Sequence, residues 1–234
     1  MTLTLKQHAY EVIRQKLLNG DFPPGGRLSD EALSKELGIS RSPIREAISQ
    51  LSSEGLVVHK PRSGAYMRKP SQQELAELYD IREALEAKAA AMSAERMDDK
   101  EITKLGNLCD QMHKLAITCR QSKSKVAGTS LTDQFLANDL EFHLAVMRGA
   151  GNERMMKLIH DFKLMTRVFG HVPVVHGLGV IARSYRHHAS IFKAIQRRDS
   201  QAASEWMAQH IRMARKYVLE GFSKQEDGSN TSPQ

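Results

Sequence analysis

Residues 19–56 read NGDFPPGGRLSDEALSKELGISRSPIREAISQLSSEGL, and this stretch decides the fold of the first part of the chain. Ser29 and Ser40 each stand directly before a run of apolar residues at helical spacing, where serine is a good N-cap. Gly38 follows the first run and Gly55 the second, and glycine commonly ends a helix. The stretch therefore predicts two short helices separated by a tight turn.

The flanking sequence completes this pattern. Apolar residues recur at helical spacing before the stretch, at Leu5, Ala9, Val12, Ile13 and Leu17. After it, residues 56–59 and 65–68 have the composition of two short strands around the turn 60–64. Three helices followed by a small hairpin is the order of a winged helix-turn-helix, which we expect over residues 1–70.

The remainder of the chain has only helical periodicity. We expect helices at roughly 71–97, 99–118, 132–149, 152–169, 178–198 and 200–222. The expected fold class is therefore mainly α, with the winged helix-turn-helix followed by an all-helical bundle over residues 71–222. Residues 223–234 are polar, and we expect them to form a disordered tail.

Composition and charge narrow the class of protein. The 234 residues carry a formal net charge of +7, and no apolar run is long enough to span a bilayer. The first residues have no signal-peptide core, so we expect a cytoplasmic protein with no membrane partner. Basic residues gather between residues 39 and 69, as a phosphate-facing surface requires. They are Arg41, Arg45, Lys60, Arg62, Arg68 and Lys69, against Glu46 and Glu54.

The second helix of the quoted stretch has the features of a recognition helix. Helical spacing places one set of polar residues on its outward surface, namely Arg41, Ser42, Arg45 and Ser49. Arginine binds guanine or phosphate, and serine can contact either base or backbone. Lys60, Arg62 and Gly64 would form the wing tip and could enter the adjacent minor groove. Each basic residue taken singly is equally consistent with an ordinary solvated surface.

A second group of candidate functional residues, one aspartate and three histidines, lies in the helical part. Asp139 and His143 are four residues apart and share one helix face. His188 and His210 lie on two later helices, each about eleven residues from the turn at 197–199. One carboxylate and three imidazoles form a partial shell for Zn, Ni or Mn. Spacing alone leaves the alternative open, because a lone histidine is more often a surface or core residue, and His187 competes with His188.

The quoted stretch, with LGISRSPIREAI and LSSEGL at its centre and end, resembles the GntR family of bacterial regulators. The resemblance implies that Arg41, Arg45 and Gly64 contact DNA, with Ser42 beside them. One branch of the family has a further DNA-contacting arginine where this chain has Glu31. The resemblance therefore implies an operator unlike that of this branch.

The helical part resembles the FCD effector domain of the FadR-type branch, in its shorter, VanR-like form with six helices. The matching residues are Asp139-x-x-Phe142-His143, Gly151-Asn152, His188-x-x-Ile191-x-x-Ala194-Ile195 and Met207-x-x-His210. The resemblance implies that Asp139, His143, His188 and His210 bind a divalent metal.

The same resemblance implies a small-carboxylate effector and a homodimer on a palindromic operator. Arg82 matches an inward-pointing arginine of the family, and Asn152 and Arg167 are further candidates for effector binding. For these three residues the ordinary interpretation stays open: exposed helix charge for the arginines and a helix cap for Asn152.

Two other functions are compatible with the pattern. A metal-dependent hydrolase with a nucleic-acid-binding appendage would use the Asp/His site to activate water, but no carboxylate is clearly reserved as its general base. A ligand-independent architectural DNA binder would have no use for the Asp/His set. The sequence therefore favours a regulator, most simply a repressor, over an enzyme.

Overall fold

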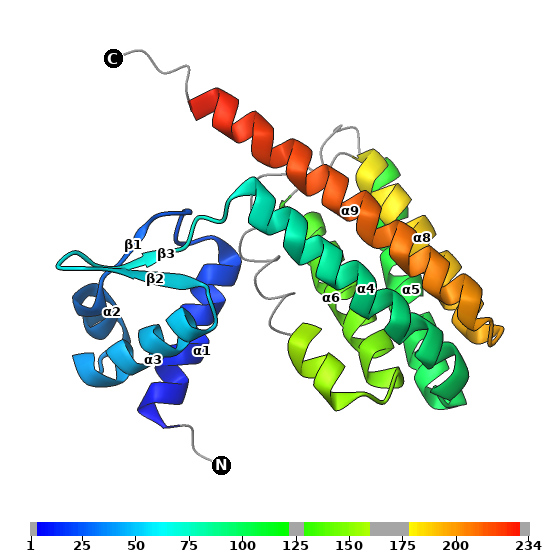
Figure 1. Ribbon diagram of the computed structural model, residues 1–234, viewed down its shortest axis with the longest axis horizontal. Helices are drawn as coiled ribbons and strands as arrows, with labels where there is room; N and C mark the ends of the chain where they lie inside the picture. Colours follow the sequence, from blue (N-terminus) through cyan, green and yellow to red (C-terminus); the bar gives the residue numbers. More distant parts are fainter. Residues whose placement is uncertain (1–3, 122–128, 160–177, 230–234) are drawn as a thin grey trace. The chain divides into compact units, whose positions relative to one another are not determined.

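The computed structural model describes residues 4–121, 129–159 and 178–229 of the chain (Figure 1). The described residues form two compact units, one ending at Ser71 and the other beginning at Gln72.

The first unit has the expected winged helix-turn-helix order. Its elements are α1 (Leu5–Asn19), β1 (Arg27–Leu28), α2 (Asp30–Leu37), α3 (Arg41–Ser53), β2 (Val57–Lys60) and β3 (Gly64–Met67). Apolar side chains of the helices and strands are buried between α1, α3 and the sheet, among them Ile13, Leu17, Leu33, Ile44, Ile48, Leu51, Leu56 and Met67. The prediction of this fold is confirmed.

The sheet has one strand more than the sequence predicted. Its order is β1-β3-β2, with both pairs antiparallel, and His59 pairs with Ala65 while Arg27 pairs with Tyr66. β1 forms because the loop before it runs along the free edge of β3, where the Met67 amide donates to the Gly26 carbonyl at 2.8 Å. A two-residue strand has too little periodicity to be found from sequence.

The two serine caps behave differently. Ser29 accepts a hydrogen bond from the Ala32 amide at 3.2 Å, as expected for an N-cap. Ser40 has the extended backbone of a cap, but its side chain makes no capping hydrogen bond. The predicted Ser40 cap is therefore wrong as regards its side chain.

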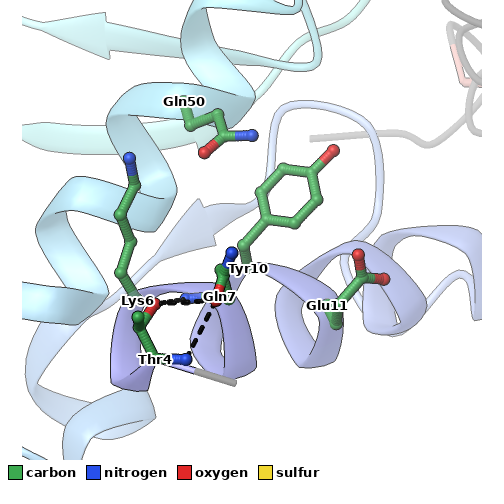
Figure 2. Close-up of a pocket in the computed structure, with 6 residues that line it drawn as sticks. All are labelled: Thr4, Lys6, Gln7, Tyr10, Glu11 and Gln50. Atoms are coloured by element: carbon green, nitrogen blue, oxygen red, sulfur yellow. Dashed lines mark hydrogen bonds between the residues drawn. The ribbon is translucent and has the colours of Figure 1, made fainter. Parts of the chain in front are cut away.

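A partly buried hydrogen bond connects α1 to the end of α3. Figure 2 shows the start of α1, where Thr4 and Gln7 form a capping box and Tyr10 follows. The Tyr10 hydroxyl donates to Glu54 Oε2 at 2.9 Å. Burial, together with this bond to the Glu54 carboxylate, raises the pKa of Tyr10.

Replacing Tyr10 by phenylalanine is expected to lower the free energy of unfolding by about 1 kcal/mol, because the half-buried Glu54 carboxylate loses its donor. Chemical denaturation of the full chain measures this loss. Tyr66→Phe is the control, because the Tyr66 hydroxyl bonds on the exposed wing, where water replaces the partner. Equal effects of the two substitutions would contradict the prediction.

The second unit is helical throughout its described residues. Its helices are α4 (Gln72–Arg96), α5 (Asp99–Gln121), α6 (Thr129–Gly149), α8 (Leu178–Gln196) and α9 (Ser200–Ser229), and residues 153–159 begin a further helix. α9 extends to Ser229, beyond residue 222, where the sequence periodicity placed the end of the last helix.

The helices of this unit pack side by side around one main core. α9 lies along α4 and α8, and α5 packs on α6 and α8 (Figure 1). Among the described residues, no helix is long and apolar enough to cross a membrane. Inside this packing lies a set of buried polar side chains, comprising Arg82, Glu86, Ser93, His143, Ser184, His188 and His210. The interior of this unit therefore contains polar side chains in addition to its apolar core, and such buried groups require hydrogen-bond partners.

Candidate functional site

The outward face of α3 carries the predicted recognition residues. Its other face buries Ile44, Ala47, Ile48 and Leu51, which fixes the rotation of the helix against α1 and α2. The helix period then leaves the remaining positions in solvent. Exposed on this face are Arg41, Ser42, Arg45 and Ser49.

One carboxylate of α2 holds both arginines of this face. Asp30 Oδ1 lies 2.9 Å from Arg41 Nη2, and Asp30 Oδ2 lies 2.6 Å from Arg45 Nε. The hydrogen bonds from Arg45 and then from Arg41 hold the pKa of Asp30 below its usual range. Asp30 is therefore ionised at neutral pH and fixes two otherwise flexible side chains in a common orientation. Sequence spacing does not reveal this contact, because Asp30 and the two arginines lie on separate helices.

The recognition helix and the wing enclose a hollow of about 470 Å³. Arg41, Arg45 and Ser49 line it from α3, and Arg62 and Gly64 line it from the wing. Arg27 of β1 also lines the hollow and lies beside Gly64. Arg27 was not singled out in the sequence, although its place between a glycine pair and an apolar residue marks the edge of a turn.

The wing tip has an unusual backbone that presents these residues. Gly64 has φ 107°, which glycine adopts freely, and Arg62 has φ 60°, which is uncommon for a residue with a side chain. Lys60 lies over the ring of Tyr66, with its Nζ 4.6 Å from the centroid. The structure thus brings the predicted residues of helix and wing to one surface, and Glu31 is exposed on neighbouring α2.

Replacing Asp30 by alanine is expected to raise affinity for non-specific DNA several-fold, because an anion that pairs with Arg41 and Arg45 is removed from the basic face. Fluorescence anisotropy with random-sequence duplex DNA, repeated across salt concentrations, measures the change. Glu31→Ala removes the same charge from an adjacent position that pairs with neither arginine in the described contacts. An equal gain in both variants would show that net charge, rather than this ion pair, sets the affinity.

The four predicted metal ligands come together in the second unit. Asp139 and His143 come from α6, His188 from α8 and His210 from α9, and their ligand atoms all lie within 4.8 Å of one another. The three imidazoles are buried, and the Asp139 side chain is partly exposed. His187, the competing histidine, contacts the Trp206 ring, with 5.8 Å between ring centroids, and is outside the cluster.

The separations within the cluster fit a single metal ion. His143 Nε2 lies 3.1 Å from His210 Nε2 and 3.4 Å from His188 Nε2, and His188 Nε2 lies 3.2 Å from Asp139 Oδ1. Two imidazole nitrogens bound about 2.0–2.1 Å from one zinc ion, at tetrahedral or octahedral angles, lie roughly 2.8–3.4 Å apart. The nitrogen separations match this spacing, so the residues present fit a divalent ion.

The protonation states of the cluster also suit a metal. Desolvation opposes ionisation of Asp139, but the imidazoles of His143 and His188 outweigh it and hold the pKa of the carboxyl well below its usual range. Burial, followed by the nearby rings of His188 and His143, holds the pKa of His210 well below its usual range. A carboxylate and a neutral imidazole are the forms that bind metal ions.

The candidate effector residues have different surroundings. Arg82 of α4 is only 6% exposed, so its interpretation as an exposed helix charge is wrong. Its Nε donates to Glu86 Oε1 at 2.7 Å. The Asn152 side chain accepts from the Met155 amide at 3.1 Å and so caps the next helix. Arg167 lies outside the described residues.

Glu86 is a residue that sequence reasoning missed. It is fully buried and accepts from Arg82 through one oxygen and from His143 Nδ1 through the other. The signal was present, because Glu86 follows Arg82 by four residues and a buried arginine needs a carboxylate partner.

Comparison with known proteins agrees with this arrangement. The family description "Bacterial regulatory proteins, gntR family" matches residues 5–67, and the FCD domain matches residues 77–213. The HTH-type transcriptional repressor RspR of Escherichia coli is 28% identical over 215 residues, which cover 90% of this chain and 87% of the repressor. The HTH-type transcriptional repressor GlaR of the same organism is 25% identical over 90% of this chain and 94% of its own length.

Solved structures show the same fold. The Escherichia coli protein McbR/YncC has a TM-score of 0.79 at 17% identity, covering 94% of this chain and all of its own. A GntR transcriptional regulator from Rhodococcus has a TM-score of 0.72 at 21% identity, covering 92% and 97% of the two chains. The relatives are named as transcription regulators rather than as enzymes. With both domains matched, this chain belongs to the GntR family of bacterial regulatory proteins, as a transcription regulator with an FCD domain.

Proposed function

We propose that the protein is a homodimeric repressor whose operator binding is modulated by a small organic acid bound at a divalent metal in the helical unit. The observation that carries this proposal is the meeting of three buried imidazoles and one carboxylate in the unit that also buries Arg82. Such a set binds a metal ion with coordination positions left for a ligand.

The DNA half of the proposal rests on the face of α3 and the wing. The side chains of Arg41 and Arg45 read bases or phosphates in the major groove, with Ser42 and Ser49 beside them. Arg62 and Gly64 bring the wing tip to the neighbouring minor groove. The hollow between helix and wing and its basic lining support this assignment.

The effector half rests on complementary charges. The metal supplies a positive centre with which one carboxylate oxygen of the ligand can bond. Arg82, buried and electrostatically coupled to Asp139, offers a guanidinium for a further anionic group. Asn152, which caps a helix, and Arg167 are secondary candidates.

The proposed homodimer connects effector binding with DNA binding. Two copies of α3 would occupy half-sites of a palindrome about one helical turn apart. An effector changes operator affinity only if it binds more tightly to one of two arrangements of the dimer than to the other. Two of the named relatives are repressors, which supports repression as the default activity.

A gel-shift titration on the DNA upstream of the protein's own gene, against a panel of small organic acids, tests the proposal. We expect a retarded complex whose apparent affinity changes with one acid in metal-loaded protein and not in chelator-treated protein. DNA binding with no response to any acid in either form would leave the transcription regulator standing and overturn the effector proposal.

A further inference from the structure

The Nδ1 atoms of the three clustered imidazoles, here called the outer nitrogens, do not have the same hydrogen-bond partners. The outer nitrogen of His143, Nδ1, bonds to the Glu86 carboxylate, and both side chains are fully buried. The Nδ1 atoms of His188 and His210 are also buried, but they have no hydrogen-bond partner among the described residues. Within the described part of the chain, His143 is therefore the ligand whose outer nitrogen is held by a carboxylate.

This bond sets the tautomer of His143. A carboxylate paired with an arginine can only accept, so His143 Nδ1 must donate its proton. The lone pair of Nε2 then faces His188, His210 and Asp139, where a metal ion would lie. A carboxylate behind a metal-binding imidazole also raises the basicity of the ligating nitrogen.

The same carboxylate holds Arg82. Its Oε1 accepts from Arg82 Nε at 2.7 Å, while Oε2 accepts from His143. Glutamine replaces one of these two oxygens with an amino group, which donates, so at this position one of the two donors would lose its acceptor. Arg82, which is joined to His143 through Glu86, is 6% exposed, so water does not readily replace a partner that Arg82 loses.

We propose that Glu86 is the positioning residue of the metal centre: it orients His143 for the metal and, through its second oxygen, makes metal affinity depend on what Arg82 binds. This inference rests on the metal site of the proposed function and adds a residue and a coupling to it. An anionic ligand that binds the Arg82 guanidinium withdraws a donor from Glu86, whose charge then acts more fully on His143 and strengthens metal binding. By reciprocity, bound metal strengthens binding of that anion.

Zn²⁺ titration of metal-depleted full-length protein, in competition with a chelating dye, tests the first part. Glu86→Gln is expected to weaken Zn²⁺ binding about 10- to 100-fold, the usual effect of losing such a partner. Ser93→Ala is the matched control, because Ser93 is equally buried on α4 and bonds to the Val146 carbonyl rather than to a residue of the cluster.

Nitrogen-15 NMR of the histidine rings provides a readout that needs no variant. In metal-free wild-type protein we expect His143 to be protonated at Nδ1 and unprotonated at Nε2. The opposite tautomer would overturn the proposal even if Glu86→Gln failed to fold.

The outcomes distinguish failure of the metal site from failure of the proposed role of Glu86. If wild-type protein binds no Zn²⁺, the metal site itself fails. If it binds Zn²⁺ tightly and Glu86→Gln binds equally well, only the role of Glu86 fails. If Glu86→Gln and Ser93→Ala lose affinity equally, general loosening of α4 explains the effect and the positioning role is overturned.

Discussion

Replacing Arg41 or Arg45 by alanine is expected to weaken operator binding by about 1–3 kcal/mol for each residue, or roughly 5- to 150-fold in Kd. Each side chain is exposed on α3 and each lies on the hollow shared with the wing. Asp30 already fixes both guanidinium groups, so little conformational freedom remains to be lost when they meet DNA. Alanine removes both the contact and this preorganisation.

The measurement is a titration with operator DNA, accompanied by a mismatched duplex. A base-contacting arginine loses discrimination between the two, whereas a phosphate-contacting arginine weakens both and flattens the salt dependence. Lys6→Ala is the control, because it removes the same charge from α1, which packs on the buried face of α3. Operator binding that survives both arginine substitutions would show that α3 is not the recognition helix.

Replacing His188 or His210 by alanine is expected to weaken Zn²⁺ binding by more than about 100-fold, because loss of a ligand exceeds the loss of a second-shell partner. Each imidazole is buried with its Nε2 directed at the cluster. Each contributes one of the four ligand atoms, and the three that remain leave the ion more open to water.

Thermal unfolding gives an independent measure of the same loss. Free Zn²⁺ at about 1,000 times Kd stabilises a binding-competent native state by roughly 4 kcal/mol. We expect this stabilisation in wild-type protein and its absence in His188→Ala and His210→Ala. His113→Ala is the control, since His113 is exposed, stacks on Tyr185 and lies outside the cluster. Equal stabilisation of all four proteins would place the metal elsewhere.

Local patterns in the sequence predicted most of the helices and strands. The helix periodicity and the glycine stops placed α2 and α3, and the alternation around residues 60–64 placed β2 and β3. The patterns failed where structure depends on partners distant in sequence. β1 exists only because its backbone meets β3.

Spacing placed candidate residues on shared helix faces, because residues three or four apart share a face and a turn returns the chain at a similar height. The sequence, through its resemblance to the GntR family and the FCD domain, indicated the recognition face and the four residues of the Asp/His cluster. It could not determine how the charges are paired. That Asp30 holds both recognition arginines on the exposed face, and that Glu86 joins Arg82 to His143, depends on side chains that meet across separate helices. Only tertiary packing decides such pairings, and for the buried Glu86 and Arg82 a partner is required because burial makes an unpaired charge costly.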